Sequence, residues 1–224
     1  EGSATPEERR SAAIRKWKEV ERVNASTNSR LRGRDRGYNL LPRVSFFAFL
    51  GVAQALISRV LGPLDDSVVL GNFTGGASTS RTRAFSHPAE KFYGMADVTE
   101  GAVQYSSLVR NSSELYRQYD FLSFMNETPG AVLFTVPKKS DIDRCACKEP
   151  DVNMFLQKGV GMHIRARLRR VGINLNDQSK NRHLALRGSI DGSLATIDLS
   201  SASDTVTRST VQALLPTDWF LYLN

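Results

Sequence analysis

Two carboxylates near the C-terminal end of the sequence could take part in chemistry, and one of them, Asp198, has the residue type and setting of a ligand for a hard metal cation. Residues 194–200 alternate between apolar and polar side chains, which predicts a half-buried β-strand that carries Asp198. A helical pattern of apolar residues follows, so we expect a helix from about residue 203 to 215. Asp204 would lie near the start of that helix, where an anion is favoured. An aspartate on a strand suits magnesium, which takes one or two carboxylates and substrate phosphates. On spacing alone, a structural aspartate followed by a helix cap is the commoner explanation.

A second group of residues is basic and suits phosphate binding. Residues 131–136 and 144–148 alternate as strands with a polar turn between them, which predicts a β-hairpin over residues 131–148. Arg144 and Lys148 share one face of the second strand. Arginine matches phosphate geometry with two hydrogen bonds, and lysine supplies a mobile charge. A solvated hairpin without a ligand is the alternative.

Three stretches together resemble the RNA-dependent RNA polymerases of single-stranded RNA bacteriophages, the leviviruses. They are RCACKEPDVNMFLQKG at residues 144–159, GINLNDQSKN at residues 172–181 and ATIDLSSASDT at residues 195–205. The last stretch looks like motif A of that family, and the basic hairpin looks like its motif F. The resemblance is specific over roughly residues 130–220 and loose over residues 1–125.

The resemblance implies an α+β fold of the right-hand polymerase type, helix-rich with a basic β-hairpin. Residues 1–125 would form the N-terminal part of the fingers, and residues 126–190 the part of the fingers that holds the hairpin. Residues 191–224 would begin the palm with its first strand and helix.

The resemblance also implies template-directed nucleotidyl transfer with two Mg²⁺ ions, for which Mn²⁺ is a possible substitute. Asp198 would be the catalytic metal ligand, and the backbone carbonyl of Leu199 a further ligand. Asp204 would read the ribose 2′-hydroxyl of the incoming nucleotide, and Lys138 and Arg144 would neutralise its triphosphate.

The family places its remaining metal carboxylates in a Gly-Asp-Asp turn, and the sequence contains none. We therefore expect a fragment of a longer enzyme that is inactive alone. The implied partners are single-stranded RNA as template and product and nucleoside triphosphates, with host translation elongation factors and a ribosomal protein as possible additions. No membrane is involved, and the implied location is the cytoplasm of the bacterial host.

Composition is consistent with this interpretation but does not require it. The 224 residues carry a net charge of +7, which favours an anionic partner such as nucleic acid. The two cysteines, Cys145 and Cys147, are too close in a strand to bridge each other, which favours a reducing compartment. We expect them to be buried as small hydrophobic residues. A reverse transcriptase fragment and a non-enzymatic basic RNA-binding module are the alternative functions.

Four other segments give structural expectations. Thr5, Pro6 and Glu8 predict a capped helix start, and residues 24–39 predict an exposed basic loop. Residues 44–61 are apolar and predict a buried core helix, because their polar residues argue against a membrane span. Residues 71–84 form a loop rich in glycine, hydroxyl side chains and arginine, for which contact with RNA phosphates and a plain loop are equally good explanations.

Overall fold

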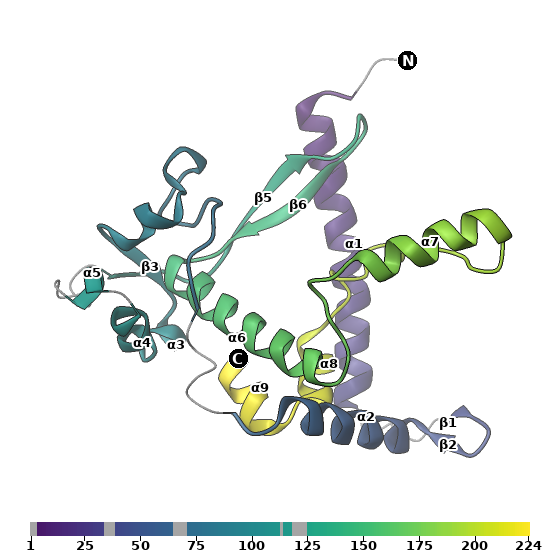
Figure 1. Cartoon of the computed structure of the whole chain (residues 1–224). Coiled ribbons are helices and arrows are strands. Elements are labelled where there is room, and N and C mark those ends of the chain that lie inside the picture. The colour runs from purple at the N-terminus through teal and green to yellow at the C-terminus, as the bar shows by residue number, and fades with distance from the viewer. Residues whose placement is uncertain (1–3, 34–38, 65–70, 113, 118–124) are drawn as a thin grey trace. The chain divides into compact units, whose positions relative to one another are not determined.

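A computed structural model describes residues 4–33, 39–64, 71–112, 114–117 and 125–224 (Figure 1). The chain forms two compact units. The first contains Glu1–Lys16 and Asp65–Ile164, and the second contains Trp17–Leu64 and Arg165–Asn224. Helix α1 (Pro6–Arg32) and helix α6 (Asp151–Arg170) each contribute residues to both units.

The first unit contains short helices and two small sheets. The parallel pair is β3 (Ala96–Val98) with β4 (Met125–Glu127), and the antiparallel pair is β5 (Val132–Pro137) with β6 (Asp143–Lys148). Its short helical elements are η2 (Arg83–Phe85), η3 (Pro88–Phe92), α3 (Glu100–Val103), α4 (Ser106–Asn111) and α5 (Glu114–Arg117). The pairing of β5 with β6 confirms the hairpin predicted over residues 131–148.

The apolar core of this unit collects around the N-terminal half of α6. Val152, Phe155 and Val160 are buried there, and the ring of Phe73 packs edge-on against Phe155 with centroids 5.2 Å apart. The chain crosses α6 closely at Gly71, where an added Cβ would lie 1.9 Å from the carbonyl oxygen of Phe155. Only glycine lets the two backbones approach this far.

A buried polar cluster ties the loop at residues 71–84 to the start of α6. The Asp151 carboxylate accepts hydrogen bonds from the hydroxyls of Ser78 and Ser80 and from the backbone N–H of Asp97. Lys91 is 2% exposed, and its ammonium donates to the carbonyl oxygens of Thr74 and Gly76 at 2.6 and 2.9 Å. These bonds satisfy groups whose burial would otherwise be costly.

The second unit is largely helical. It holds the strands β1 (Asn39–Leu41) and β2 (Val44–Ser45) and the helices α2 (Phe46–Leu61), α7 (Ser179–Asp191), α8 (Arg208–Leu214) and α9 (Thr217–Leu223). Its most buried side chain is Trp219, whose indole N–H donates to the Gly62 carbonyl at 2.9 Å. Helices and small sheets together confirm the α+β class.

Three structural expectations were wrong in this unit. Helix α1 continues through Arg32, so most of the loop expected at residues 24–39 is helical where the structure describes it. The apolar helix expected at residues 44–61 forms as α2, but only its last residue, Leu61, is buried. Its exposed large side chains are Phe47, Phe49, Val52 and Leu56, each about half or more accessible. Its apolar composition therefore does not correspond to a core position within this chain.

The third error concerns residues 194–200, which form no strand. Residues 193–199 have no regular structure and residues 200–205 form turns. A strand needs a neighbour that satisfies its backbone N–H and C=O groups, and no described segment pairs with this one. The helix expected from about residue 203 begins at Arg208, because Thr207 caps it by accepting a hydrogen bond from the N–H of Thr210. Among the described residues, no helix combines the length and the apolar character needed to cross a bilayer.

Candidate functional site

The β5–β6 hairpin presents its basic side chains to solvent. Arg144 pairs across the sheet with Val136, and Lys138 follows β5 directly in the connecting turn. Both side chains are exposed, and within the described part of the chain no hydrogen bond or ion pair engages either one. Two free cations on one hairpin are an arrangement that can bind a polyphosphate.

Lys148, on the same strand as Arg144, has a different role. The Lys148 ammonium lies 5.4 Å from the centroid of the Phe134 ring, a diagonal contact across the two strands, because Lys148 itself pairs with Val132. A cation over an aromatic face contributes about 0.5–1 kcal/mol at an exposed site. Lys148 therefore stabilises the hairpin through this contact.

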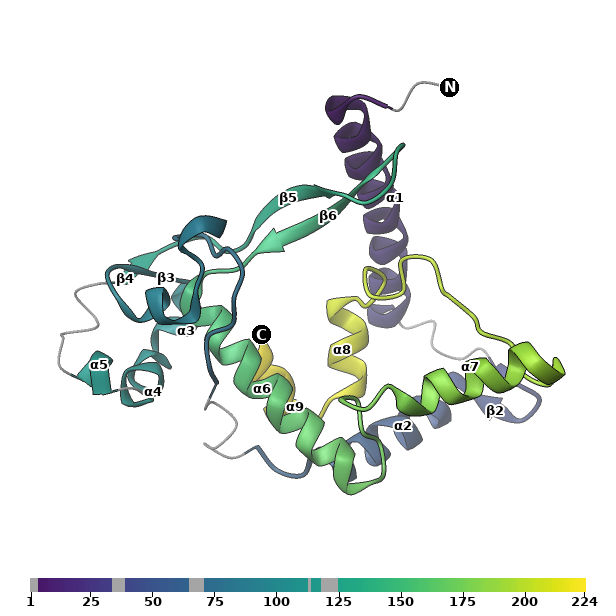
Figure 2. The same cartoon turned by 45° about the horizontal axis from the view of Figure 1, so that its top comes forward.

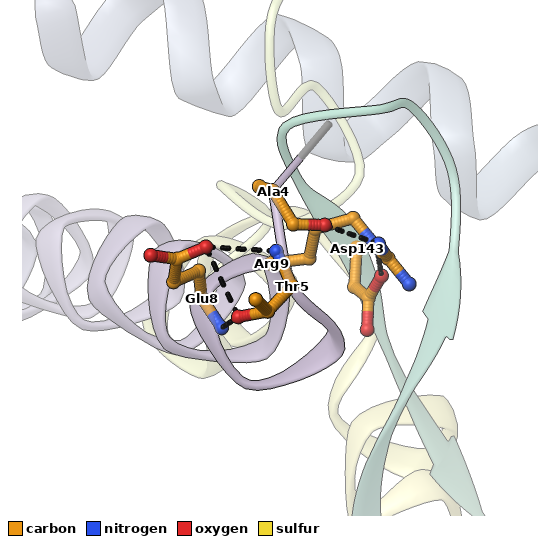
Figure 3. A network of polar contacts seen from close by, with 5 residues as sticks. All are labelled: Ala4, Thr5, Glu8, Arg9 and Asp143. Atoms are coloured by element: carbon orange, nitrogen blue, oxygen red, sulfur yellow. Dashed lines mark hydrogen bonds and ion pairs between the residues drawn. The ribbon is translucent and has the colours of Figure 1, made fainter. Parts of the chain in front are cut away.

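The hairpin turn contacts the N-terminus of α1, which runs alongside it in both views (Figures 1 and 2). The backbone N–H of Ala4 donates to the carbonyl of Ser140 in the turn at 3.2 Å. The Arg9 guanidinium donates from Nε to Asp143 Oδ1 at 3.3 Å and from Nη1 to the Ala4 carbonyl at 2.6 Å (Figure 3). One helix end thus fixes both the middle and the end of the turn.

The helix end itself is a complete capping box, as its sequence predicts. The Glu8 carboxylate accepts from the Thr5 N–H at 2.7 Å and from its hydroxyl at 3.0 Å, and the Glu8 N–H donates back to that hydroxyl at 3.3 Å (Figure 3). The backbone N–H and then the hydroxyl of Thr5 hold the pKa of Glu8 below its usual value.

The second group of expected site residues lies in the second unit. Asp198, Leu199 and Asp204 are all exposed, on the irregular segment that precedes α8. Leu199 is 69% accessible although its alternation predicts a half-buried position. The turn at residues 200–205 contains Ser201 with φ of 54°, a left-handed conformation that few non-glycine residues adopt. This turn separates the Asp198 backbone from the Asp204 backbone.

A polar stripe on α1 holds the segment around Asp204. Asn24 donates to the backbone carbonyl of Asp204 at 2.9 Å, and Asn28 accepts from the N–H of Ser209 at 3.2 Å. Arg32 donates to the Ser209 hydroxyl at 3.2 Å. Asn24, Asn28 and Arg32 recur every four residues and so lie on one face of the helix.

The described part of the chain does not contain a complete set of metal ligands. No group of three or more histidine, cysteine, aspartate or glutamate side chains gathers there. Asp198 offers one carboxylate, and Leu199 offers one carbonyl. Magnesium requires near-octahedral oxygen coordination and two ions require shared carboxylates, so these donors do not by themselves fit a two-ion site.

The structure also places the 71–84 loop and the two cysteines. The hydroxyls of Ser78 and Ser80 bind Asp151 and the Arg81 guanidinium donates to the Tyr93 carbonyl, so these three side chains of the 71–84 loop already have protein partners. Cys145 is only half-buried and Cys147 is exposed, which corrects their assignment as buried residues. Desolvation and, secondarily, the charge of Glu149 raise the pKa of the Cys147 thiol.

The structure thus brings Lys138 and Arg144 together on one hairpin, and Asp198, Leu199 and Asp204 onto one segment of the other unit. Sequence reasoning missed Arg9 and Asp143, whose pairing across more than a hundred residues leaves no local signal. It also missed the α1 stripe, although the four-residue spacing of Asn24, Asn28 and Arg32 was a usable signal once residues 24–32 were recognised as helical.

Comparisons with known proteins identify what this chain is similar to. The family model described as RNA replicase, beta-chain, matches residues 1–224. The RNA-directed RNA polymerase beta chain of Enterobacteria phage GA is 44% identical over 181 residues, which are 78% of this chain and 34% of that protein. The protein of the same name from Escherichia phage MS2 is 46% identical over 160 residues, which are 68% of this chain and 29% of that protein.

A relative of slightly lower identity gives the same result. The RNA-directed RNA polymerase subunit beta of Escherichia virus Qbeta is 41% identical over 148 residues, 66% of this chain and 24% of that protein. The chain therefore spans about a third or less of the length of the curated relatives that it matches.

Proposed function

The chain belongs to the RNA replicase beta-chain family, and we propose that it forms the fingers region and the first palm segment of a right-hand RNA-dependent RNA polymerase. In this proposal residues 1–125 and 126–190 belong to the fingers, and residues 191–224 begin the palm. The relatives named as RNA-directed RNA polymerases support the reaction class. The substrates would be nucleoside triphosphates and a single-stranded RNA template.

The observation that carries the proposal is the exposed basic hairpin. Lys138 and Arg144 lie on it without protein partners among the described residues. During nucleotidyl transfer, negative charge develops on the transferring phosphate and on the leaving pyrophosphate, and fixed cations stabilise it. The hairpin would contribute the charge of these two side chains to the triphosphate.

Asp198 would contribute one carboxylate to a metal site that residues outside this chain complete. Two bound Mg²⁺ ions, or Mn²⁺ in their place, would activate the attacking 3′-hydroxyl and stabilise the phosphate charge. The carbonyl of Leu199 would be an additional ligand, and the Asp204 carboxylate would accept a hydrogen bond from the ribose 2′-hydroxyl. The single-carboxylate donor set supports the further proposal that the 224-residue chain alone is inactive.

The irregular conformation of residues 194–200 is consistent with this assignment. Their alternation is that of a strand, and an edge partner from the rest of a palm sheet would supply the missing backbone hydrogen bonds. We expect the segment to become a strand in the longer protein. Host translation elongation factors and a ribosomal protein as partners, and the bacterial cytoplasm as location, remain predictions from the family resemblance.

The decisive experiment replaces Asp198 with Asn in the full-length replicase subunit that contains this segment. The substitution keeps the shape and removes one negative charge, so RNA binding should persist while nucleotide incorporation falls by roughly a thousandfold, as expected for a lost transition-state interaction. Asp141→Asn, at an exposed position of the hairpin turn, is the matched control and should keep full activity. An Asp198→Asn enzyme with normal turnover would exclude the metal-ligand role.

Two outcomes would support the alternative functions. Efficient use of deoxyribonucleotides by the wild-type enzyme would indicate a reverse transcriptase. RNA binding without incorporation under any metal condition would indicate a non-enzymatic RNA-binding module.

A further inference from the structure

The Arg9–Asp143 ion pair connects the N-terminal helix to the position directly before Arg144. Asp143 is 9% exposed and Arg9 is 20% exposed, so the pair is much less solvated than an ordinary surface ion pair. Asp143 also pairs across the sheet with Pro137, the residue before Lys138. Asp143 therefore lies at the end of the hairpin that also carries the two cations proposed to bind the triphosphate.

We propose that Arg9 is a positioning residue for the nucleotide-binding hairpin: it holds the turn in place and keeps the Asp143 carboxylate from pairing with Lys138 or Arg144. The inference rests on the proposed function of the hairpin. Arg9 acts through Asp143 and through Ala4, whose backbone N–H donates to the Ser140 carbonyl of the turn.

The geometry supports the first part, the holding of the turn. A two-stranded hairpin in water is marginally stable without further packing. Here the turn is closed by one internal hydrogen bond, from the Lys139 N–H to the Ile142 carbonyl at 3.0 Å. It is anchored from outside by Ala4 at Ser140 and by Arg9 at Asp143. Arg9 reinforces the first anchor too, because its Nη1 donates to the Ala4 carbonyl.

The charges support the second part, in which Lys138 and Arg144 stay free of the Asp143 carboxylate. A poorly solvated carboxylate needs a cationic or hydrogen-bonding partner, and Arg9 is the one that the structure supplies. Without Arg9, the hairpin itself offers cations beside Asp143, among them Arg144, next in sequence, and Lys138, one position beyond the cross-strand neighbour. A carboxylate paired with either would compete with the phosphates of the nucleotide.

The first test measures the turn and needs no nucleotide. Amide hydrogen exchange is followed in the 224-residue chain for the wild type, for Arg9→Met and for Arg10→Met. Methionine retains the helix propensity and the length of the side chain. We expect Arg9→Met to accelerate exchange of the Lys139 amide by about tenfold, the size of effect that loss of a charged hydrogen bond produces on local opening.

Arg10→Met is the matched control, because Arg10 is the next residue of the same helix, is exposed and has no bond to the turn. It should leave exchange at Lys139 unchanged. Unchanged exchange in Arg9→Met would overturn the positioning role, and equal acceleration in both variants would also overturn it.

The second test measures nucleotide use by the full-length replicase subunit. Arg9→Met should raise the KM for nucleoside triphosphates several-fold with little change in kcat, since Asp143 would then compete for the triphosphate-binding cations. Adding Asp143→Asn should restore much of the KM while exchange at Lys139 stays fast, because the competing charge is gone but the anchor is still missing. A merely structural role predicts that the double variant keeps the KM of Arg9→Met, and that result would overturn the release of the cations.

The two tests separate this inference from the proposed function. A wild-type subunit whose KM does not respond to Arg144→Ala would overturn the hairpin as the triphosphate site and, with it, the release of the cations. The exchange experiment would still decide whether Arg9 holds the turn.

Discussion

The Ser78 hydroxyl donates a 2.6 Å hydrogen bond to Asp151 Oδ1, and both side chains are almost completely buried. The bond joins a glycine- and serine-rich loop to the first turn of α6, 73 positions away in the sequence. With the Ser80 hydroxyl and the Asp97 N–H, it gives the Asp151 carboxylate three donors. Loop, strand β3 and helix α6 therefore meet at one charged group.

This cluster predicts a strong stability effect at position 151. Asp151→Ala leaves three donors without an acceptor, two of them on buried residues, and should lower the free energy of unfolding of the chain by about 3 kcal/mol. Asp151→Asn should cost less, because the amide retains one acceptor and can donate to the Ser78 hydroxyl, which accepts as well as donates. Urea denaturation measures both variants.

The control for position 151 is Asp141→Ala at an exposed site of the hairpin turn, which should change stability by less than about 0.5 kcal/mol. Equal stability of Asp151→Ala and the wild type would show that the three bonds do not contribute to folding.

The capping box predicts a pH dependence at Glu8. Its pKa is lowered in the folded chain, so it contributes stability above its unfolded pKa and loses that contribution as the pH falls through its folded pKa. Glu8→Gln keeps the capping hydrogen bonds but not the charge. The wild type should therefore be more stable than the variant at neutral pH, and the difference should disappear once the pH has fallen below the folded pKa of Glu8.

Thermal unfolding of both proteins at several pH values measures this difference. A wild type and a Glu8→Gln variant that differ equally at all pH values would contradict the role of the charge. Thr5→Ala should cost about 1 kcal/mol at neutral pH, since it removes the cap hydroxyl.

The raised pKa of Cys147 predicts slow alkylation. Thiolate is the reactive form, so at neutral pH iodoacetamide should modify Cys147 more slowly than it modifies a free cysteine, with the rate still rising above the usual thiol pKa. Cys145→Ser isolates the reaction at one site. Adding Glu149→Gln removes the secondary cause of the shift and should accelerate the reaction modestly. Mass spectrometry of timed samples gives the rates, and a fast reaction at neutral pH would contradict the raised pKa.

Asp204, and Asn24 which binds its backbone carbonyl, predict an effect on sugar specificity in the full-length replicase subunit. Asp204→Asn keeps one acceptor but loses the charge, and it should weaken discrimination between ribo- and deoxyribonucleotides more than it lowers the rate. Asn24→Ala removes the hydrogen bond to the Asp204 carbonyl and should weaken discrimination in the same direction. Incorporation of paired ribo- and deoxyribonucleotides measures both effects. Unchanged discrimination in both variants would remove Asp204 from ribose recognition.

The exposed cations predict salt-sensitive RNA binding by the 224-residue chain. The contributing side chains would be Arg83, Lys138, Arg144, Arg169 and Arg170, which are exposed, whereas Arg81 and Arg165 already donate within the protein. Affinity for single-stranded RNA should fall by roughly 0.7 log units per log unit of salt for each phosphate neutralised. Arg144→Ala should reduce that slope by one such step. Fluorescence anisotropy over a salt series gives the slope, and binding that is independent of salt would contradict the prediction.

Local patterns predicted the local structure well. The alternation of residues 131–136 and 144–148 predicted the hairpin, and Thr5, Pro6 and Glu8 predicted the start and the cap of α1. These features depend on neighbours in sequence or on a short turn, so a single sequence contains their cause. The placement of Lys138 and Arg144 on one hairpin followed directly from that prediction.

Long-range features could not be predicted from the same patterns. Apolar residues in α2 indicated burial, but burial depends on which surface covers a helix, and within the described residues little covers Phe49 or Val52. The alternation at residues 194–200 indicated a strand, but a strand forms only beside a partner. The contacts of Arg9 with Asp143 and of Asn24 with Asp204 depend on the tertiary fold.

The close crossing at Gly71 has a genetic consequence. A change in the first or second base of a glycine codon always removes glycine, and any residue that replaces it would place a carbon atom 1.9 Å from the Phe155 oxygen. Consequently, no single change at either of these bases gives an amino acid that position 71 can accommodate. In a replicating population, copying errors at these two bases would be removed by misfolding of the product, before its activity was ever selected.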